Sequence, residues 1–230
     1  MSEERVTKVK VCGITRTEDV HACVELGVDW LGLNFWPRSK RAIDREQGAA
    51  LAHEVRARDA AVAIVGVFVD QPIDDMRAIA DAVGLSWLQL HGHESPSVCR
   101  ELVDLGYRVV KAMGLSSAAD AERLAGYPGD MVLADTPCPG FGGSGQTFDW
   151  QLLADSRLRQ QRSVILAGGL RADNVGAAIA MVRPVAVDIA SGVESAPGIK
   201  DANRIAALLQ AVAAADAQLA ARDDRVGPFR

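Results

Sequence analysis

Two residues of different acid–base chemistry stand at the ends of predicted strands. Cys12 ends the apolar run "KVKVC", and Asp135 ends the run "MVLAD". A thiol and a carboxyl group can both transfer protons near neutral pH when their surroundings shift their pKa values. If both side chains face one cavity, they could act on opposite ends of one small substrate. Each residue also has a plainer interpretation, Cys12 as a buried apolar cysteine and Asp135 as a helix cap or a loop-bracing acid.

Two glycine-bearing segments have the chemistry of a phosphate site. The segment "LAGGL" contains Gly168 and Gly169, and "ASGVES" contains Ser191 and Gly192. Glycine lets backbone N–H groups approach an anion closely, and in (β/α)8 barrels the loops after the seventh and eighth strands commonly bind phosphate. Gly143, within the "GGSG" of residues 142–145, either adds a further amide or serves as a hinge over the site.

The loop "NFWPRSKRAI" gathers three cations, Arg38, Lys40 and Arg41. A guanidinium in this loop could form two parallel hydrogen bonds to a substrate carboxylate, although a solvated basic loop is the plainer interpretation. The histidines of "HGHE", His91 and His93, suggest a metal site. No third ligand follows at a suitable spacing, so we expect no metal.

Short runs rich in β-branched residues alternate with helical patterns along the whole chain, and their starts recur every ~20–35 residues. The runs cover residues 8–12, 30–35, 63–69, 87–91, 108–113, 131–135, 163–168 and 185–191. This order predicts an α/β protein, a (β/α)8 TIM barrel that forms a single domain over residues 1–230, with a tail that frays from about residue 221. A doubly wound open sheet is the alternative.

Side-chain alternation predicts which residues face the barrel interior. If the apolar positions such as Val9, Val11 and Val187 face the helices, the other parity faces inward. That inward set contains Lys8, Lys10, Cys12, Gly32, Asn34, Gly66, Phe68, Gln89, His91, Leu133, Asp135, Ala186, Asp188 and Ala190. Its polar members gather late in their strands, where barrel active sites lie. The first and sixth strands lie on opposite sides of such a ring, so Cys12 would face Asp135, and Lys10 below it would favour the thiolate.

Composition excludes several classes of protein. The chain has 230 residues, of which 49% are hydrophobic and 24% are charged, so a large core is expected and disorder is not. A formal net charge of −5 does not indicate the basic surface that binds nucleic acid. The chain contains no run of 18 apolar residues, so we expect no membrane span. The four cysteines are scattered, and no signal peptide is evident, so we expect reduced thiols and a cytoplasmic protein.

Several segments together resemble phosphoribosylanthranilate isomerase, a family of the tryptophan pathway. They are "KVCGIT", "GLNFWPRSKRAI", "GVFVD", "LQLHGHES", "LADTPCPGFGGSGQTFDW", "LAGGL" and "VDIASGVESAPGIKD", in order from about residue 8 to about residue 210. The resemblance implies an Amadori rearrangement that converts N-(5-phosphoribosyl)anthranilate to 1-(2-carboxyphenylamino)-1-deoxyribulose 5-phosphate without a cofactor. It also implies a small phosphorylated substrate and no nucleic-acid or membrane partner, and it leaves open a monomer or a homodimer.

The resemblance implies a role for each main site residue. Cys12 would be the base that removes the proton from the sugar C2, Asp135 the acid that protonates the furanose ring oxygen, and Arg41 the partner of the anthranilate carboxylate. Three alternatives stay open: a pentose-phosphate epimerase, a Schiff-base aldolase that uses Lys10, and a non-catalytic sensor of a phosphorylated ligand.

Overall fold

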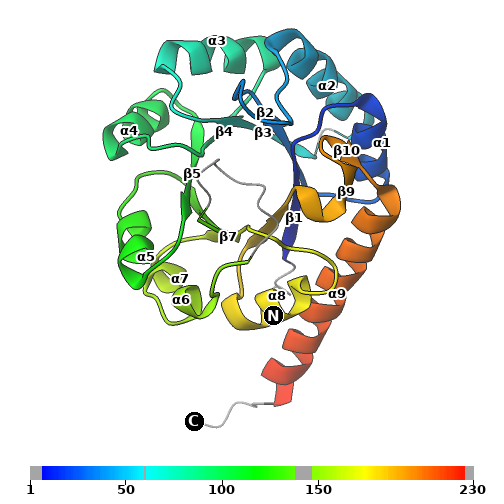
Figure 1. The fold of residues 1–230 in the computed structure, drawn as a ribbon, viewed down its shortest axis with the longest axis vertical. Coiled ribbons are helices and arrows are strands. Elements are labelled where there is room, and N and C mark those ends of the chain that lie inside the picture. The colour runs from blue at the N-terminus through cyan, green and yellow to red at the C-terminus, as the bar shows by residue number, and fades with distance from the viewer. Residues whose placement is uncertain (1–6, 60, 138–146, 226–230) are drawn as a thin grey trace.

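A closed ring of parallel strands forms the centre of the molecule (Figure 1). The computed structural model describes residues 7–59, 61–137 and 147–225. The strands pair in chain order, and the last pairs back with the first; they are β1 Lys8–Cys12, β2 Trp30–Asn34, β3 Ala63–Phe68, β4 Trp87–Leu90, β5 Arg108–Gly114, β6 Met131–Asp135, β7 Val164–Leu166 and β8 Ala186–Ile189. The eight predicted strands and the (β/α)8 barrel are therefore confirmed, and the open sheet is wrong.

Helices surround this ring (Figure 1). They are α1 Thr17–Glu25, α2 Arg45–Arg58, α3 Ile73–Val83, α4 Pro96–Asp104, α5 Ala118–Ala125, α6 Gln151–Ala154, α7 Leu158–Gln161, α8 Val175–Val182 and α9 Ala202–Arg225. After β8 the chain forms a 3₁₀ turn, η1 Ser191–Val193, and a small hairpin of β9 Glu194–Ala196 and β10 Ile199–Lys200. These short elements belong to the loop region at the end of the barrel where we expect the site.

Local capping residues explain where several helices begin. The Ser117 side chain accepts the N–H of Asp120 while the Asp120 side chain accepts the N–H of Ser117, which is a complete capping box for α5. Asp44 accepts the N–H of Gln47 at 2.8 Å and so starts α2. The caps fix where each helix begins after its strand, with three residues between β5 and α5 and ten residues between β2 and α2.

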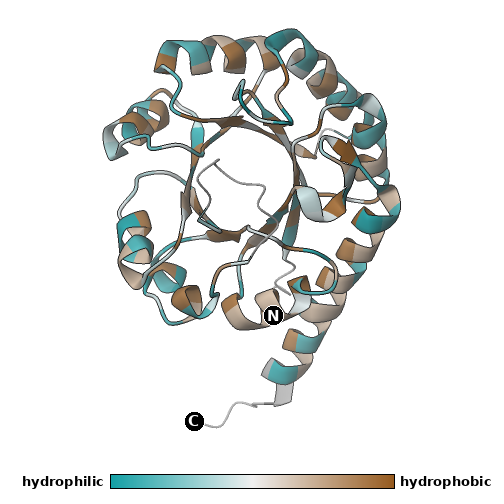
Figure 2. Cartoon of the chain, in the orientation of Figure 1, coloured by the Kyte–Doolittle hydropathy of each residue, from teal (hydrophilic) through white to brown (hydrophobic). Residues whose placement is uncertain are grey.

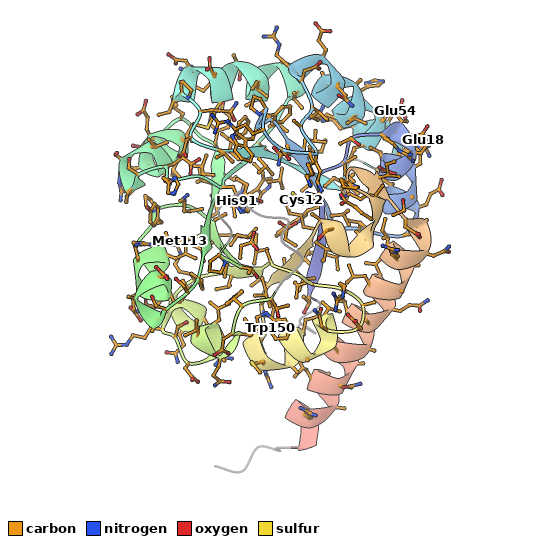
Figure 3. The ribbon with its side chains drawn as sticks, in the orientation of Figure 1. Cys12, Glu18, Glu54, His91, Met113 and Trp150 are labelled. Carbon is orange, nitrogen blue, oxygen red and sulfur yellow. The ribbon has the colours of Figure 1, made fainter. Side chains whose placement is uncertain are left out.

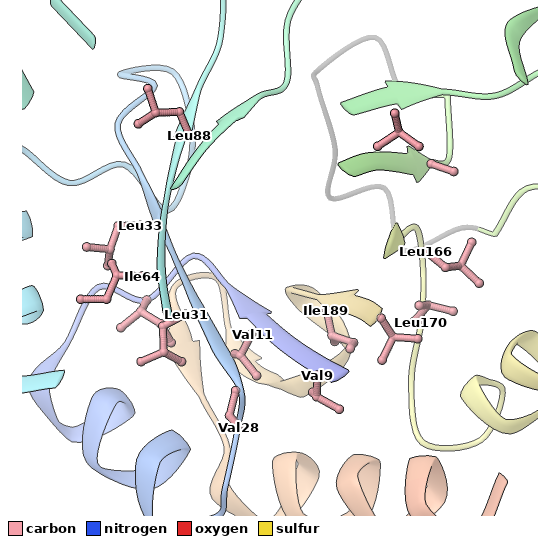
Figure 4. Packing of buried hydrophobic residues seen from close by; sticks show 14 of the residues in the cluster. Val9, Val11, Val28, Leu31, Leu33, Ile64, Leu88, Leu166, Leu170 and Ile189 are labelled. Carbon is pink, nitrogen blue, oxygen red and sulfur yellow. The ribbon is translucent and has the colours of Figure 1, made fainter. Parts of the chain in front are cut away.

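The hydrophobic core has two layers. The outer layer lies between strands and helices and includes Val11, Leu31 and Ile189 (Figure 4). The inner layer fills the barrel with side chains from Val65, Trp87, Val110, Ala112, Leu133, Ile165, Ala167 and Ala186. Figure 2 shows mostly hydrophobic strands inside helices that mix hydrophobic and hydrophilic residues. Because the barrel is packed and is not a pore, a ligand site must lie at one of its ends.

The predicted inward positions hold on most strands and are wrong on β3. Phe68 stacks on Phe35 in the outer layer, with ring centroids 5.4 Å apart. A Cβ added to Gly66 would lie 2.5 Å from Leu85 Cδ1, which also places it on the helix side. Val65 packs inside the barrel instead. The run "AIVGVFV" is apolar at every position, so its alternation holds no information about which side faces inward.

The C-terminal helix extends further than the sequence indicates. Residues 221–225, where we expect fraying, continue α9 as far as Arg225. Residues 226–230 and the predicted site residue Gly143 lie outside the described residues. Within residues 7–59, 61–137 and 147–225, no helix is both long and apolar enough to cross a membrane.

The contact between α2 and Phe35, the residue after β2, yields a prediction about stability. A Cβ added to Gly48 would lie 2.7 Å from Phe35 Cε1 and 2.8 Å from Cζ. Replacing glycine by alanine inside a helix usually stabilises by about 1 kcal/mol, but here the Phe35 ring would have to leave its stack on Phe68. We expect Gly48→Ala to lower the free energy of unfolding by about 1–3 kcal/mol, measured by urea denaturation.

Gly176→Ala in α8 is the matched control. The nearest atom to a Cβ at this position is Ala215 Cβ, at 3.9 Å, so the alanine has room. We expect this variant to be more stable than the wild type by about 0.5–1 kcal/mol. Equal stabilisation by both substitutions would show that Phe35 does not limit the space beside α2.

Candidate active site

A cavity of about 530 Å³ opens where the strands end. Ten of the predicted site residues line it: Cys12, Asn34, Arg41, His91, Asp135, Gly168, Gly169, Asp188, Ser191 and Gly192. Figure 3 shows Cys12 and His91 near the centre of the barrel mouth. The other two described members of the predicted set, Lys10 and Gln89, are buried and are not among the lining residues. The structure thus brings together side chains from strands far apart in the sequence.

Cys12 ends β1 in a position that only a glycine neighbour allows. A Cβ on Gly32 of β2 would lie 2.8 Å from Cys12 Sγ and 3.1 Å from Lys10 Nζ. Burial raises the pKa of the Cys12 thiol, and the ammonium groups of Lys10 and Lys200 offset only part of this effect. Lys10 therefore favours the thiolate, as expected, but burial outweighs it.

Beneath the thiol, Lys10 forms an ion pair with Asp188. Its Nζ lies 3.0 Å from both carboxylate oxygens, and the Lys10 side chain is buried. Burial lowers the pKa of Lys10, but the negative charge of Asp188 and the neighbouring Cys12 outweigh burial and leave the pKa raised. A Schiff-base lysine needs a neutral amine that reaches its substrate. Lys10 is held as a cation below the cavity floor, which does not suit an aldolase.

Asp135 ends β6 and is held from two sides. Its Oδ2 lies 3.2 Å from His91 Nε2, and its Oδ1 accepts the N–H of Thr136 at 2.7 Å. Gln89 Nε2 in turn lies 2.8 Å from His91 Nδ1. The three side chains of Gln89, His91 and Asp135 therefore form a row that runs from the barrel interior into the cavity and fixes the direction of the carboxyl group.

The two histidines of "HGHE" have different partners. His91 contacts Asp135, whereas His93 Nδ1 lies 3.3 Å from Asp70 Oδ2. Across the described ranges no group of three or more His, Cys, Asp or Glu side chains is placed to hold a metal ion.

The loops after β7 and β8 require glycine. Gly168 and Gly169 have φ values of 89° and 61°, in the left-handed region. A Cβ on Gly168 would lie 2.3 Å from Thr136 Oγ1 and 2.9 Å from Asp135 Oδ1. At Gly192 the added Cβ would lie 2.0 Å from the carbonyl oxygen of Leu170. Gly168, Gly169 and Gly192 also line the cavity, so part of its wall is backbone that no side chain covers.

Arg41 reaches the cavity from the loop after β2. The main chain of Asn34 anchors this loop, since its carbonyl accepts the N–H of Ile43 at 2.9 Å. Arg41 donates from Nε and Nη2 to the two carboxylate oxygens of Glu194, at 2.7 and 2.6 Å. The hydrogen bond to Glu194 raises the pKa of Arg41 and outweighs the opposing effect of burial. Glu194 therefore holds the guanidinium at the edge of the cavity.

Two residues of the site, Glu194 and its second partner Lys200, were not predicted from the sequence. Glu194 is buried, lines the cavity and also accepts from Lys200 Nζ at 2.7 Å. Lys200 Nζ donates to the carbonyl oxygen of Cys12 as well, at 2.6 Å. Nothing in the spacing of "ASGVES" marks Glu194, because its main partner, Arg41, is 153 positions away.

This fold, with an acid and a thiol at the carboxyl ends of the strands, places the chain among the (β/α)8-barrel enzymes. A family model described as N-(5′-phosphoribosyl)anthranilate (PRA) isomerase matches residues 9–211. The chain is 44% identical to the N-(5′-phosphoribosyl)anthranilate isomerase of Thermotoga petrophila over 200 residues, which are 87% of this chain and 95% of that protein.

Two solved structures are similar over most of their length. Monomers of the dimeric phosphoribosylanthranilate isomerase of Thermotoga maritima superpose with a TM-score of 0.80 at 38% identity, covering 90% of this chain and 99% of theirs. A phosphoribosylanthranilate isomerase in complex with reduced 1-(o-carboxyphenylamino)-1-deoxyribulose 5-phosphate gives a TM-score of 0.80 at 37% identity, with the same coverage. The chain belongs to the N-(5′-phosphoribosyl)anthranilate isomerase family, and it is an isomerase of tryptophan biosynthesis.

The environment of Cys12 predicts how its thiol reacts. Because burial raises its pKa, alkylation by iodoacetamide should be slow at pH 7 and should rise through a midpoint above the ordinary thiol value of about 8.5. Peptide mass mapping after labelling at a series of pH values measures this midpoint for Cys12 alone. In Lys10→Met the midpoint should move higher, since a cation is lost beside the thiol and Asp188 is left unpaired. A midpoint below 8 in the wild type would contradict this account of the thiol.

Proposed function

We propose that this isomerase catalyses the Amadori rearrangement of N-(5′-phosphoribosyl)anthranilate with Asp135 as general acid and Cys12 as general base. The observation that carries the proposal is that both side chains line one cavity although β1 and β6 lie on opposite sides of the ring. A substrate that lies across the mouth meets a carboxyl group on one side and a thiol on the other. Acid–base chemistry at two separate atoms of one sugar, the ring oxygen and C2, requires such a placement.

Asp135 donates the first proton. Protonation of the furanose ring oxygen breaks the bond between that oxygen and C1 and leaves a Schiff base at the anilinic nitrogen. The contacts from His91 and Thr136 hold the carboxyl group in one direction, so the proton is delivered at a fixed point of the cavity. A positioned acid of this kind typically contributes 10²–10⁴-fold to the rate.

Cys12 removes the proton from the sugar C2. Its thiolate takes this proton, the C2 electrons move into the C1–C2 bond, and the Schiff base becomes an enolamine. Transfer of a proton from the C2 hydroxyl to C1 then gives the ketone, so the reaction is an isomerisation with no net oxidation. A thiol whose pKa is raised by burial forms a stronger base once it ionises, and Lys10 and Lys200 stabilise that thiolate.

Two anion sites flank these proton-transfer groups. The backbone around Gly168, Gly169, Ser191 and Gly192 would hold the phosphate, and Gly143, which lies outside the described residues, would add a further amide. Arg41 would hold the anthranilate carboxylate. The close packing at Gly168 and Gly192 supports the first assignment, and the place of Arg41 at the cavity edge supports the second. Because the chain has a net charge of −5, a substrate with two anionic groups needs local positive groups, which Arg41 and the backbone N–H groups of these loops would supply.

We also propose that residues 1–230 form one domain that works in the cytoplasm as a monomer or a homodimer. A single closed barrel and the free thiols of Cys12, Cys23 and Cys99 support the first two points. The dimeric relative from Thermotoga maritima makes the homodimer a state to test.

The central test uses variants of the two proton-transfer groups. Purified protein is mixed with freshly generated phosphoribosylanthranilate, and the loss of its fluorescence is followed. We expect Asp135→Asn and Cys12→Ser each to lower kcat on the order of 10²-fold or more, because each removes a group that moves a proton. Variants with near wild-type kcat would refute the assignment, and binding of the phosphosugar by the wild type without turnover would favour a sensor.

Arg41 should act mainly on substrate binding. Arg41→Ala removes the proposed partner of the carboxylate, and we expect KM to rise on the order of tenfold while kcat changes less. Arg157→Ala is a control, since Arg157 precedes α7 and is not among the cavity residues. An unchanged KM in Arg41→Ala would remove Arg41 from this role.

A further inference from the structure

Glu194 has a place in the cavity wall that the proposed chemistry does not use. Its side chain is 4% exposed, and it accepts from Arg41 Nε, Arg41 Nη2, Lys200 Nζ and the N–H of Gly198, at 2.7, 2.6, 2.7 and 3.2 Å. Its own backbone carbonyl accepts from Arg204. Burial alone would raise the pKa of Glu194, but the hydrogen bonds from Arg41 and Lys200 hold it below its usual range. Glu194 is therefore a buried carboxylate anion with defined partners.

The pairing with Glu194 leaves a specific part of Arg41 available. An arginine has five N–H donors, and the two bonds to Glu194 use the Nε–H and one of the two hydrogens on Nη2. The remaining hydrogen of Nη2 and one hydrogen of Nη1 form a second planar fork at the end of the guanidinium. Nη1 has no partner among the described residues, and the Arg41 side chain is 14% exposed and lines the cavity. This second fork matches the geometry of another carboxylate.

The packing around Arg41 restricts it to this orientation. Gly13, which follows Cys12, has a φ of 76°, and a Cβ at this position would lie 2.3 Å from Arg41 Cδ. The aliphatic part of the Arg41 side chain therefore packs directly against the backbone of Gly13, just after the end of β1. Glu194 holds the head of the side chain while Gly13 makes room for the stem, so the guanidinium can rotate only if the Glu194 pair breaks.

Charge also favours a single carboxylate as the ligand. Arg41, Lys200 and Glu194 together carry one net positive charge. Lys200 is not among the residues that line the cavity, and its ammonium is also bonded to the carbonyl oxygens of Cys12 and Ala190, at 2.6 and 3.5 Å. The cluster therefore presents one excess positive charge through one free fork, which suits one carboxylate.

We propose that Glu194 is a positioning residue for substrate recognition: it fixes Arg41 side-on so that the free end of the guanidinium selects substrates with a carboxylate on the aromatic ring. The inference rests on the proposed role of Arg41 and deepens it. It assigns specificity for the ortho-carboxylated arylamine to a pair of residues rather than to one. Removal of Glu194 adds positive charge to the cavity, so a purely electrostatic role predicts tighter binding, whereas a positioning role predicts weaker binding.

The test compares two ligands in four proteins. The ligands are the reduced product analogue, reduced 1-(o-carboxyphenylamino)-1-deoxyribulose 5-phosphate, and the same molecule with hydrogen in place of the carboxylate. The proteins are the wild type, Arg41→Ala, Glu194→Gln and the double variant, and the Kd values come from titration calorimetry. We expect the wild type to prefer the carboxylate roughly 10–100-fold, as for other charged hydrogen bonds, and all three variants to lose most of that preference.

The double variant distinguishes positioning from an independent contact. If Glu194 acts through Arg41, Glu194→Gln should change little in the Arg41→Ala background, and in the isomerase assay Glu194→Gln alone should raise KM far more than it lowers kcat. Loss of the preference in Arg41→Ala with full retention in Glu194→Gln would overturn the inference and leave the role of Arg41 intact. Full retention in Arg41→Ala would instead refute that role, and the inference with it.

Two further variants control for folding. The Glu94 side chain is as buried as that of Glu194, at 3% exposure, and is paired with Lys111 at 2.8 Å, but it does not line the cavity. Glu94→Gln should lower the melting temperature without changing the carboxylate preference. Glu194→Asp keeps the charge on a shorter side chain, so it should restore part of the preference if Glu194→Gln folds poorly. A preference no greater in Glu194→Asp than in Arg41→Ala would count against positioning by the carboxylate.

Discussion

An ion pair lies at the seam where the barrel closes. Lys10 and Asp188 are register partners across β1 and β8, and the Lys10 ammonium contacts both carboxylate oxygens at 3.0 Å inside the protein. A buried pair adds little net stability, but removing one partner typically costs about 3–5 kcal/mol because a charge is left unpaired. Cys12 lies two residues further along the same face of β1. The contact that joins the first strand to the last therefore also sets the charge beneath the thiol.

The fold could be predicted because its signals are local and repeated. Each strand is a short apolar run, each helix a periodic segment, and their alternation leaves few architectures. Which side chains face the barrel interior was predictable where a polar residue interrupts the apolar run, as Asp188 does in "VAVDIAS". Both Asp188 and Ala186 do face inward. On β3 every residue is apolar, so only packing could decide, and the contacts of Phe68 with Phe35 put it on the helix side.

The candidate site was predictable to the extent that its residues end strands. Cys12, His91 and Asp135 follow from strand ends and parity, and the structure brings them to one cavity. The features of the site that could not be predicted from the sequence depend on contacts between segments that are distant in the chain. Glu194 gives no signal in its own loop, and its importance appears only when the loops after β2 and β8 meet. The direction of the pKa shift at Cys12 could not be predicted either. Burial opposes the effect of Lys10 on the thiol, and the extent of that burial depends on how the barrel packs.

The partners that complete this site are encoded at opposite ends of the chain. Lys10 pairs with Asp188, which is 178 positions later in the sequence. The carbonyl oxygen of Cys12 accepts a hydrogen bond from Lys200, which is 188 positions later. During synthesis, a nascent chain that stops before β8 already contains the thiol, the acid and the guanidinium. It has neither the strand that closes the cylinder nor the carboxylates that balance its cations. Roughly the last fifth of the polypeptide, from β8 onward, therefore closes the barrel and supplies these carboxylates, so the complete site can form only when translation is almost finished.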